Sequence, residues 1–232
     1  MYRHFCMAAT ACLLISQCVG TMVKIMPEYK SMNVEKSRLG IILLTDNMAI
    51  SNPEDIADYL GSGETKQVFY DFFISPISEF AEQDGNFDEV IIVSGGDTSG
   101  FATITEQLFY DTQVCLRVPE QKAFGGDSLQ YLLILDHIDV SREKNPGKMV
   151  VVGGMYGIPT KRIIGEFDNL KIKGTFVLWD NVAGKIAAFG QISEKSDVLT
   201  AMTKNSWTDI VQRISTDIFI NQPYGIQTAA PR

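Results

Sequence analysis

The segment Tyr131-Leu-Leu-Ile-Leu-Asp-His-Ile-Asp-Val-Ser141 decides the fold of this chain. In its first half, Leu132-Leu-Ile-Leu135, the residues that would point to either face of a strand are all apolar. A strand with this pattern is covered on both of its faces, as in the centre of a sheet with packing on either side. We therefore expect Tyr131 to Ser141 to be a central strand.

Two further strands are predicted downstream of it. Leu170 to Trp179 has a period of two, in which apolar residues alternate with Lys171, Lys173 and Thr175. Asp180 to Lys185 has the composition of a turn, since Asp and Asn bond their own backbone and Gly tolerates positive φ. Ile186 to Ile192 then reads as the return strand of a hairpin.

The region before the central strand predicts a β-α-β unit. Leu39 to Thr45 is a continuous apolar run typical of a buried strand, and Asp88 to Val93 is predicted to be a second one. Between them, Asn52 to Asp55 begins a short helix. Gln67 to Ala81 has helical spacing interrupted by Pro76, which fits one kinked helix or two short ones.

The chain is predicted to close with a helix. Ser206-Trp-Thr-Asp209 has the form of a capping box, and an apolar face led by Trp207 follows it. The fold class is therefore α/β (α+β), a mixed sheet of about five strands with helices packed on it. We expect a single domain over residues 39–222 and a disordered tail over 223–232.

Composition limits the classes of partner. The 232 residues carry a formal charge of −8 with a pI near 4.8, and the densest basic cluster is the pair Lys161-Arg162. Phosphate binding needs clustered Lys and Arg, so nucleic acid is excluded as a partner.

The first residues predict an export signal. Phe5 to Ile15 is an apolar run, and Leu14-Ile-Ser-Gln-Cys18 resembles the lipobox of bacterial lipoproteins, although Gln17 stands where a small residue is favoured. We expect a signal peptide over residues 1–18, lipidation of Cys18 and a polar tether over residues 19–38. The protein would then be periplasmic and anchored to the outer membrane. A buried N-terminal helix is the alternative.

Cysteine and histidine usage predicts no metal site and no cofactor. Three of the four cysteines lie in the leader, and no spacing of the cysteines with His4 and His137 matches a zinc site. The fourth, Cys115, is predicted to be a buried thiol on a strand from Gln113 to Val118. His137 is predicted to be a hydrogen-bonded structural residue.

Two glycine-rich segments are candidate sites. Ser94 to Gly100 follows a predicted strand, and a helix is expected after it from Phe101 to Tyr110. A glycine-rich turn between a strand and a helix can present backbone N–H groups to an anion. The residues that would bind the anion are Gly95, Gly96, Asp97 and Gly100. Asp97 or Asp46 would supply an acid/base or metal-binding group. A solvated turn explains this segment equally.

The second segment is Val150 to Gly157, which fits a short strand and a hairpin whose Met155-Tyr156 tip binds a protein partner. An ordinary loop is the other interpretation of it.

A series of predicted elements within Leu39 to Ile220 carries a resemblance to a known family. It consists of the strand Tyr131 to Asp136, the strand ending Phe176-Val-Leu-Trp-Asp180, the turn to Gly184-Lys185 and the helix that Trp207 leads. It resembles bacterial envelope lipoproteins with the fold of the TolB N-terminal domain. These include the lipoprotein activators of penicillin-binding proteins and the periplasmic domain of the curli secretion channel. The resemblance implies a non-catalytic lipoprotein that binds an envelope protein and helps assemble or regulate an envelope complex. The alternative is an enzyme or small-ligand protein that uses residues 94–100 as an anion cradle.

Overall fold

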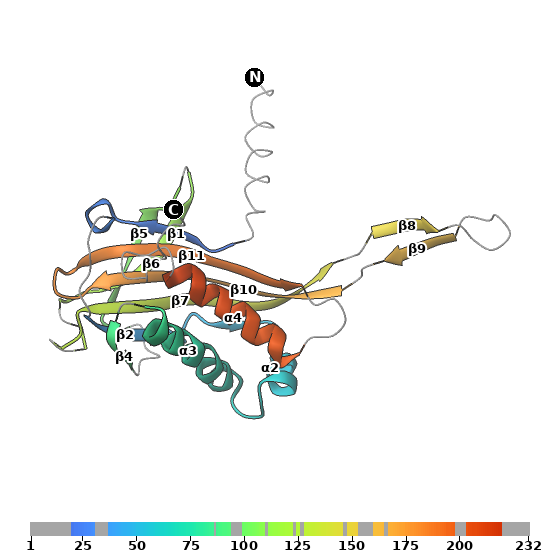
Figure 1. Ribbon diagram of the computed structural model, residues 1–232, viewed down its shortest axis with the longest axis horizontal. Coiled ribbons are helices and arrows are strands. Elements are labelled where there is room, and N and C mark those ends of the chain that lie inside the picture. Colours follow the sequence, from blue (N-terminus) through green and yellow to red (C-terminus); the bar gives the residue numbers. More distant parts are fainter. Residues whose placement is uncertain are drawn as a thin grey trace, which may run out of the picture.

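The computed structural model describes residues 20–30, 37–85, 87–93, 99–109, 111–122, 124–125, 128–145, 148–152, 160–164, 167–197 and 203–219. Its main sheet has seven strands: β1 (Met22–Ile25), β2 (Ser37–Leu43), β3 (Ala49–Ile50), β4 (Phe87–Ile92), β7 (Tyr131–Asn145), β10 (Phe167–Asp180) and β11 (Lys185–Asp197). Their order is β1-β11-β10-β7-β2-β4, with β3 paired to β7 (Figure 1). The fold is mixed α/β as predicted, and the sheet is larger than expected.

The predicted core of the sheet is confirmed. β7, β10 and β11 are neighbours and pair antiparallel, with β10 between the other two. The turn between β10 and β11 contains Gly184 at φ +68°, a conformation that glycine adopts without strain. The amide N–H of Gly184 donates to the carbonyl oxygen of Asp180 at 2.8 Å.

The β-α-β prediction is confirmed in topology and corrected in burial. β2 lies between β7 and β4 and is parallel to both. β4 was expected to be a buried strand, but it is the last strand of the sheet, and Asp88, Glu89 and Ile92 on it are exposed. An edge strand has one neighbour only, so its apolar residues are only partly covered.

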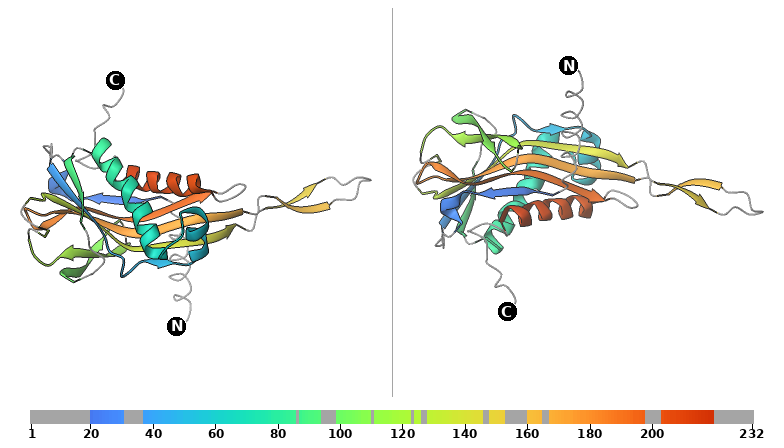
Figure 2. Two further views of the ribbon diagram at one scale, coloured as in Figure 1. Left: turned by 90° about the horizontal axis from the view of Figure 1, so that it is seen from below. Right: turned by 90° about the horizontal axis from the view of Figure 1, so that it is seen from above.

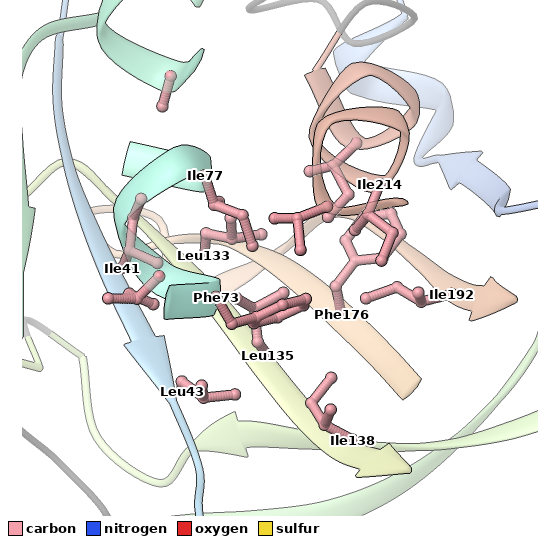
Figure 3. Close-up of a cluster of buried hydrophobic side chains, with 14 of the residues drawn as sticks. Ile41, Leu43, Phe73, Ile77, Leu133, Leu135, Ile138, Phe176, Ile192 and Ile214 are labelled. Atoms are coloured by element: carbon pink, nitrogen blue, oxygen red, sulfur yellow. The ribbon is translucent and has the colours of Figure 1, made fainter. Parts of the chain in front are cut away.

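Three helices are described, α2 (Pro53–Tyr59), α3 (Thr65–Gln83) and α4 (Lys204–Phe219). α3 and α4 lie side by side on one face of the sheet (Figure 2). α3 is one helix that includes Pro76. In the core beneath these helices, Phe73 packs near Leu133 and Leu135 of β7 and Phe176 of β10 (Figure 3).

The predicted start of α4 is wrong by about one turn. The helix begins at Lys204, so Ser206 lies inside it and Thr203 precedes it. The hydroxyl of Thr203 accepts from the Ser206 N–H, and the Ser206 hydroxyl accepts from the Thr203 N–H, each at 3.4 Å. This reciprocal pair satisfies two N-terminal donors in the manner of a capping box, with Thr203 in the place that the sequence suggested for Ser206.

The other face of the sheet is covered by a hairpin, β5 (Phe101–Gln107) and β6 (Gln113–Pro119). The prediction of a helix from Phe101 to Tyr110 is therefore wrong. Thr103 and Thr105 are exposed whereas Ala102 and Ile104 between and before them are partly buried, and the β-branched residues of this segment favour a strand. Cys115 is on a strand, as expected, but it is exposed, because Val114 and Leu116 take the side that faces the sheet.

The prediction of a polar tether over residues 19–38 is also wrong. Met22 to Ile25 form β1, which pairs antiparallel with β11, and a 3-10 helix, η2 (Pro27–Tyr29), follows it. β2 already begins at Ser37. The folded domain thus starts before residue 39, whereas the predicted signal peptide and the predicted tail from 223 lie outside the described residues.

Candidate functional site

Most of the predicted site residues lie outside the described part of the chain. These are Cys18, Gly95, Gly96, Asp97, Met155 and Tyr156. Gly100 is described, and it is exposed at the start of β5 with φ +84°. Its carbonyl oxygen accepts from the N–H of Glu120 at 2.9 Å, so Gly100 extends the β5–β6 pairing at the end remote from the turn.

The anion cradle predicted at residues 94–100 loses its main support. A strand follows this segment where the prediction required a helix, so no helix N-terminus points at it from Phe101. Asp46 is exposed in the turn after β2. β2 and β4 are parallel neighbours, so Asp46 and residue 94 do follow adjacent strands, as expected.

The segment Val150 to Gly157, predicted to be a short strand and a hairpin, lies within a two-stranded arm. β8 (Lys148–Val152) and β9 (Thr160–Ile164) pair antiparallel in register, with Lys148 opposite Ile164 and Val152 opposite Thr160. They make a separate two-stranded sheet. This β8–β9 arm continues the direction of β7 and β10 and projects away from the helices and the main sheet (Figures 1 and 2).

The sequence of the arm is apolar and basic. β8 contains Met149 and three consecutive valines, and β9 ends in Ile163-Ile164. Its charged residues are Lys148, Lys161 and Arg162, and neither strand contains an acidic residue. Neighbouring residues of a strand belong to opposite faces, so apolar residues occur on both faces of the arm.

A second polar feature lies where β7 bulges against β10. The register shifts between Lys173 and Thr175 of β10, and His137 on the opposing strand has φ +51°. Such a φ is uncommon for a residue with a Cβ. Gly174 lies within the shift, where an added Cβ would approach Ile138 Cδ1 to 2.5 Å. The bulge therefore depends on a glycine on one strand and a strained residue on the other.

The Asp136 carboxylate beneath this bulge is buried and holds it together. Its Oδ1 accepts from the His137 backbone N–H at 2.7 Å and from the Asn47 side-chain amide at 3.0 Å. Its Oδ2 lies 2.7 Å from Nδ1 of His137 and 3.8 Å from Nε of Arg117, without hydrogen-bond alignment to either. His137 is predicted to be a hydrogen-bonded structural residue; its backbone N–H makes such a bond, whereas its side chain is 45% exposed and only contacts Asp136.

Chemically, this arrangement presents a single oriented imidazole to solvent. Among the described residues, no group of three or more His, Cys, Asp or Glu could hold a metal ion. The contributions of Asn47 and Arg117 to this cluster come from other elements, and only the fold reveals them.

A third polar cluster fixes the N-terminal segment. Tyr29 is buried, and its hydroxyl donates to Asp180 Oδ2 at 2.7 Å. Burial, followed by the neighbouring Asp180 carboxylate, raises the pKa of Tyr29 well above its usual range. The ammonium of Lys185 lies 5.2 Å from the centre of the Tyr29 ring. These contacts join η2 to the turn between β10 and β11.

The start of β1 is held by a buried carboxyl. Oε1 of Glu194 accepts from the backbone N–H of Thr21 at 3.0 Å and from its hydroxyl at 3.2 Å. Burial and the nearby Asp217 raise the pKa of Glu194, while Thr21 and Arg213 act in the opposite direction. The ionised Glu194 carboxylate is therefore destabilised by burial at neutral pH, although its hydrogen bonds fix the first residues of the domain.

The charge of the molecule is unevenly distributed. Residues 54 to 89 contain ten acidic residues and one basic residue, Lys66. Nine of the acidic residues are exposed: Glu54, Asp58, Glu64, Asp71, Glu79, Glu82, Asp84, Asp88 and Glu89. They follow α2, the outer side of α3 and the edge strand β4. We call this set the acidic edge.

Within the described residues, no helix combines the length and the apolar character that crossing a membrane requires.

Comparison with known proteins gives no family. No protein-family model matches the chain, and no curated protein matches it. A solved PelC dodecamer from Paraburkholderia phytofirmans is similar at 10% identity with a TM-score of 0.38, over 89% of this chain and 99% of that chain. A protein of the family DUF330 from Xanthomonas campestris is similar at 10% identity with a TM-score of 0.34, over 86% and 90%. Similarity at this level transfers no residue role and no activity.

Proposed function

We propose that this chain is a non-catalytic lipoprotein of a bacterial cell envelope, which binds a protein partner and helps to assemble or regulate an envelope complex. The observation that carries the proposal is the β8–β9 arm, which in the described chain pairs with no other strand. An isolated two-stranded hairpin is at best marginally stable in water. A partner that packs on the arm would supply apolar contacts that stabilise it.

The composition of the arm indicates the kind of partner. Apolar residues on both faces of a ribbon cannot both be covered by one packed layer, so the partner would enclose the arm or add a strand to its edge. The cations Lys148, Lys161 and Arg162 favour a binding surface with acidic residues around an apolar centre. The Met155-Tyr156 pair is the proposed tip of the same surface.

The proposed location follows from the leader. The apolar run Phe5 to Ile15 and the lipobox-like end at Cys18 support export and lipidation, which would place the domain in the periplasm on the outer membrane. A lipid anchor keeps such a protein close to membrane-embedded partners. The mass of the N-terminal peptide from native membranes tests this, since an intact Met1 would contradict export.

Removal of the arm tests partner binding. Asn145 of β7 pairs with Phe167 of β10, so residues 146–166 can be replaced by the two-residue turn Asn-Gly that closes tight hairpins. We expect the shortened protein to keep its unfolding midpoint and to lose the crosslinked partner in native envelopes. Retention of the same crosslinked complex would refute the role of the arm.

Substitution at the tip is a finer test of the same surface. Met155→Ala combined with Tyr156→Ala should lower partner capture by about tenfold or more, the typical effect of truncating an aromatic anchor in an interface. Val182→Ala is the matched control, because Val182 is 70% exposed in the turn between β10 and β11. Equal capture by the tip variant and the control would remove Met155 and Tyr156 from the interface.

A further inference from the structure

We infer that the lipid on Cys18 holds the β1 edge of the sheet directly against the bilayer surface, with the acidic edge turned away from the membrane. The inference rests on the proposed lipidation. The sequence predicted a flexible tether between the lipid and the domain, whereas here the domain keeps one orientation relative to the membrane. The chain itself supplies two independent arguments, the length of chain between the anchor and the fold and the distribution of charge.

The first described residue, Gly20, is already bonded to the main sheet. The N–H of Gly20 donates to the carbonyl oxygen of Ser193 on β11 at 2.9 Å. Thr21 is held next to it by two hydrogen bonds to the Glu194 carboxyl, at 3.0 and 3.2 Å. Backbone and side chain therefore both fix the entry of the chain into the sheet.

The pairing that follows is close. β1 runs antiparallel to β11 from Met22, opposite Gln191, to Ile25, opposite Ala188. At Gly190 an added Cβ would lie 2.1 Å from the carbonyl oxygen of Met22, so only glycine permits this approach. The position of β1 is thus specified by a residue of β11, as expected for a packed strand and not for a linker.

Chain length then limits the distance to the lipid. Only Val19 separates Cys18 from Gly20. A fully extended chain spans at most about 3.6 Å per residue, so the Cα of Cys18 lies within about 7 Å of that of Gly20. A diacylglyceryl group at Cys18 has its acyl chains in the bilayer, so the start of β1 at Gly20 must lie close to the headgroup level.

The distribution of charge agrees with this orientation. β1 and β4 are at opposite ends of the strand order. Five strand spacings of about 4.8 Å place β4, with Asp88 and Glu89 of the acidic edge, about 24 Å from β1, beyond the Debye length of about 8 Å at physiological ionic strength. Near Gly20, Lys171 and Lys195 flank Glu143 and Arg213 contacts Glu194, so the anchored end lacks the excess of carboxylates. At that distance salt screens the carboxylates of β4 from anionic headgroups, and the anchored end presents no excess of negative charge for the headgroups to repel.

Site-specific labelling of the full, lipidated protein tests the orientation. In a Cys115→Ser background, a small fluorophore is placed on Ser193→Cys beside Gly20 or on Asp88→Cys of β4. The protein is reconstituted in vesicles of phosphatidylethanolamine and phosphatidylglycerol that contain a headgroup-linked quencher. We expect several-fold stronger quenching at residue 193 than at residue 88, and thermal unfolding confirms that both variants fold.

A matched variant changes only the spacing. About 20 Gly and Ser residues inserted between Val19 and Gly20 span about 25 Å as a flexible coil, comparable to the width of the sheet. The ratio of quenching at the two sites should then fall toward one. Equal quenching at both sites with the native spacing overturns the fixed orientation. Failure of the proposed lipidation is a different result, because the protein would then lack the lipid mass and would not bind the vesicles.

Discussion

Replacement of Tyr29 by phenylalanine tests whether the N-terminal segment is part of the folded domain. The side chain is buried and its hydroxyl donates to the Asp180 carboxylate at 2.7 Å. Tyr29→Phe keeps the ring, and with it the contact to Lys185, and removes only this hydrogen bond. A buried hydrogen bond to a charged group contributes about 1.5 to 3 kcal/mol. We expect a loss of about 2 kcal/mol in the free energy of unfolding.

For a protein of this size that loss lowers the melting temperature by about 4 to 8 °C. The effect also depends on pH. Because the pKa of Tyr29 is raised in the folded protein, the folded state keeps this proton when the unfolded state loses it near pH 10. Stability from this group is therefore complete below pH 10 and declines above it. Tyr29→Phe should remove that alkaline component.

Urea unfolding at pH 8 and above pH 10 measures both effects. Tyr59→Phe is the control, because in the described structure the Tyr59 hydroxyl makes no hydrogen bond, and its loss should change stability by less than about 0.5 kcal/mol. If Tyr29→Phe destabilises no more than Tyr59→Phe, η2 is not docked and the account of the N-terminal segment is wrong.

Three further substitutions test other parts of the fold. Gly190→Ala should cost about 1 to 3 kcal/mol by overpacking and should release β1, seen as faster amide exchange at Lys24, whereas Gln191→Ala should leave β1 protected. Glu194→Gln should leave the free energy of unfolding unchanged at pH 4 and raise it at pH 7. The pKa of this carboxyl is raised in the folded protein, so its contribution to stability falls as pH rises. An equal effect of the substitution at both pH values would contradict this. Trp207→Ala should cost about 3 to 5 kcal/mol in urea unfolding. Trp207→Phe should cost clearly less, since the buried indole N–H has no hydrogen-bond partner, and equal losses would refute that reasoning.

The sequence by itself determined the centre of the sheet and the helices that cover it. β10 is long and its apolar residues repeat with a period of two, whereas β7 contains a continuous apolar run that favours a strand covered on both faces. α4 also has a clear pattern, since its buried residues Trp207, Ile210, Val211, Ile214 and Ile218 follow the helical repeat. In such elements the local pattern and the final environment agree. The mixed α/β fold class follows from them.

Only the tertiary structure decided the place of the short elements and the environment of single side chains. β1 has four residues, too few for a period, and it is a strand because β11, more than 160 residues away, offers backbone partners and a glycine at residue 190. The bulge at His137 needs Gly174 of β10 and Asn47 from the turn after β2. Local sequence reports which residues are apolar, but a short edge strand or a bulge forms only when a distant segment satisfies its backbone groups.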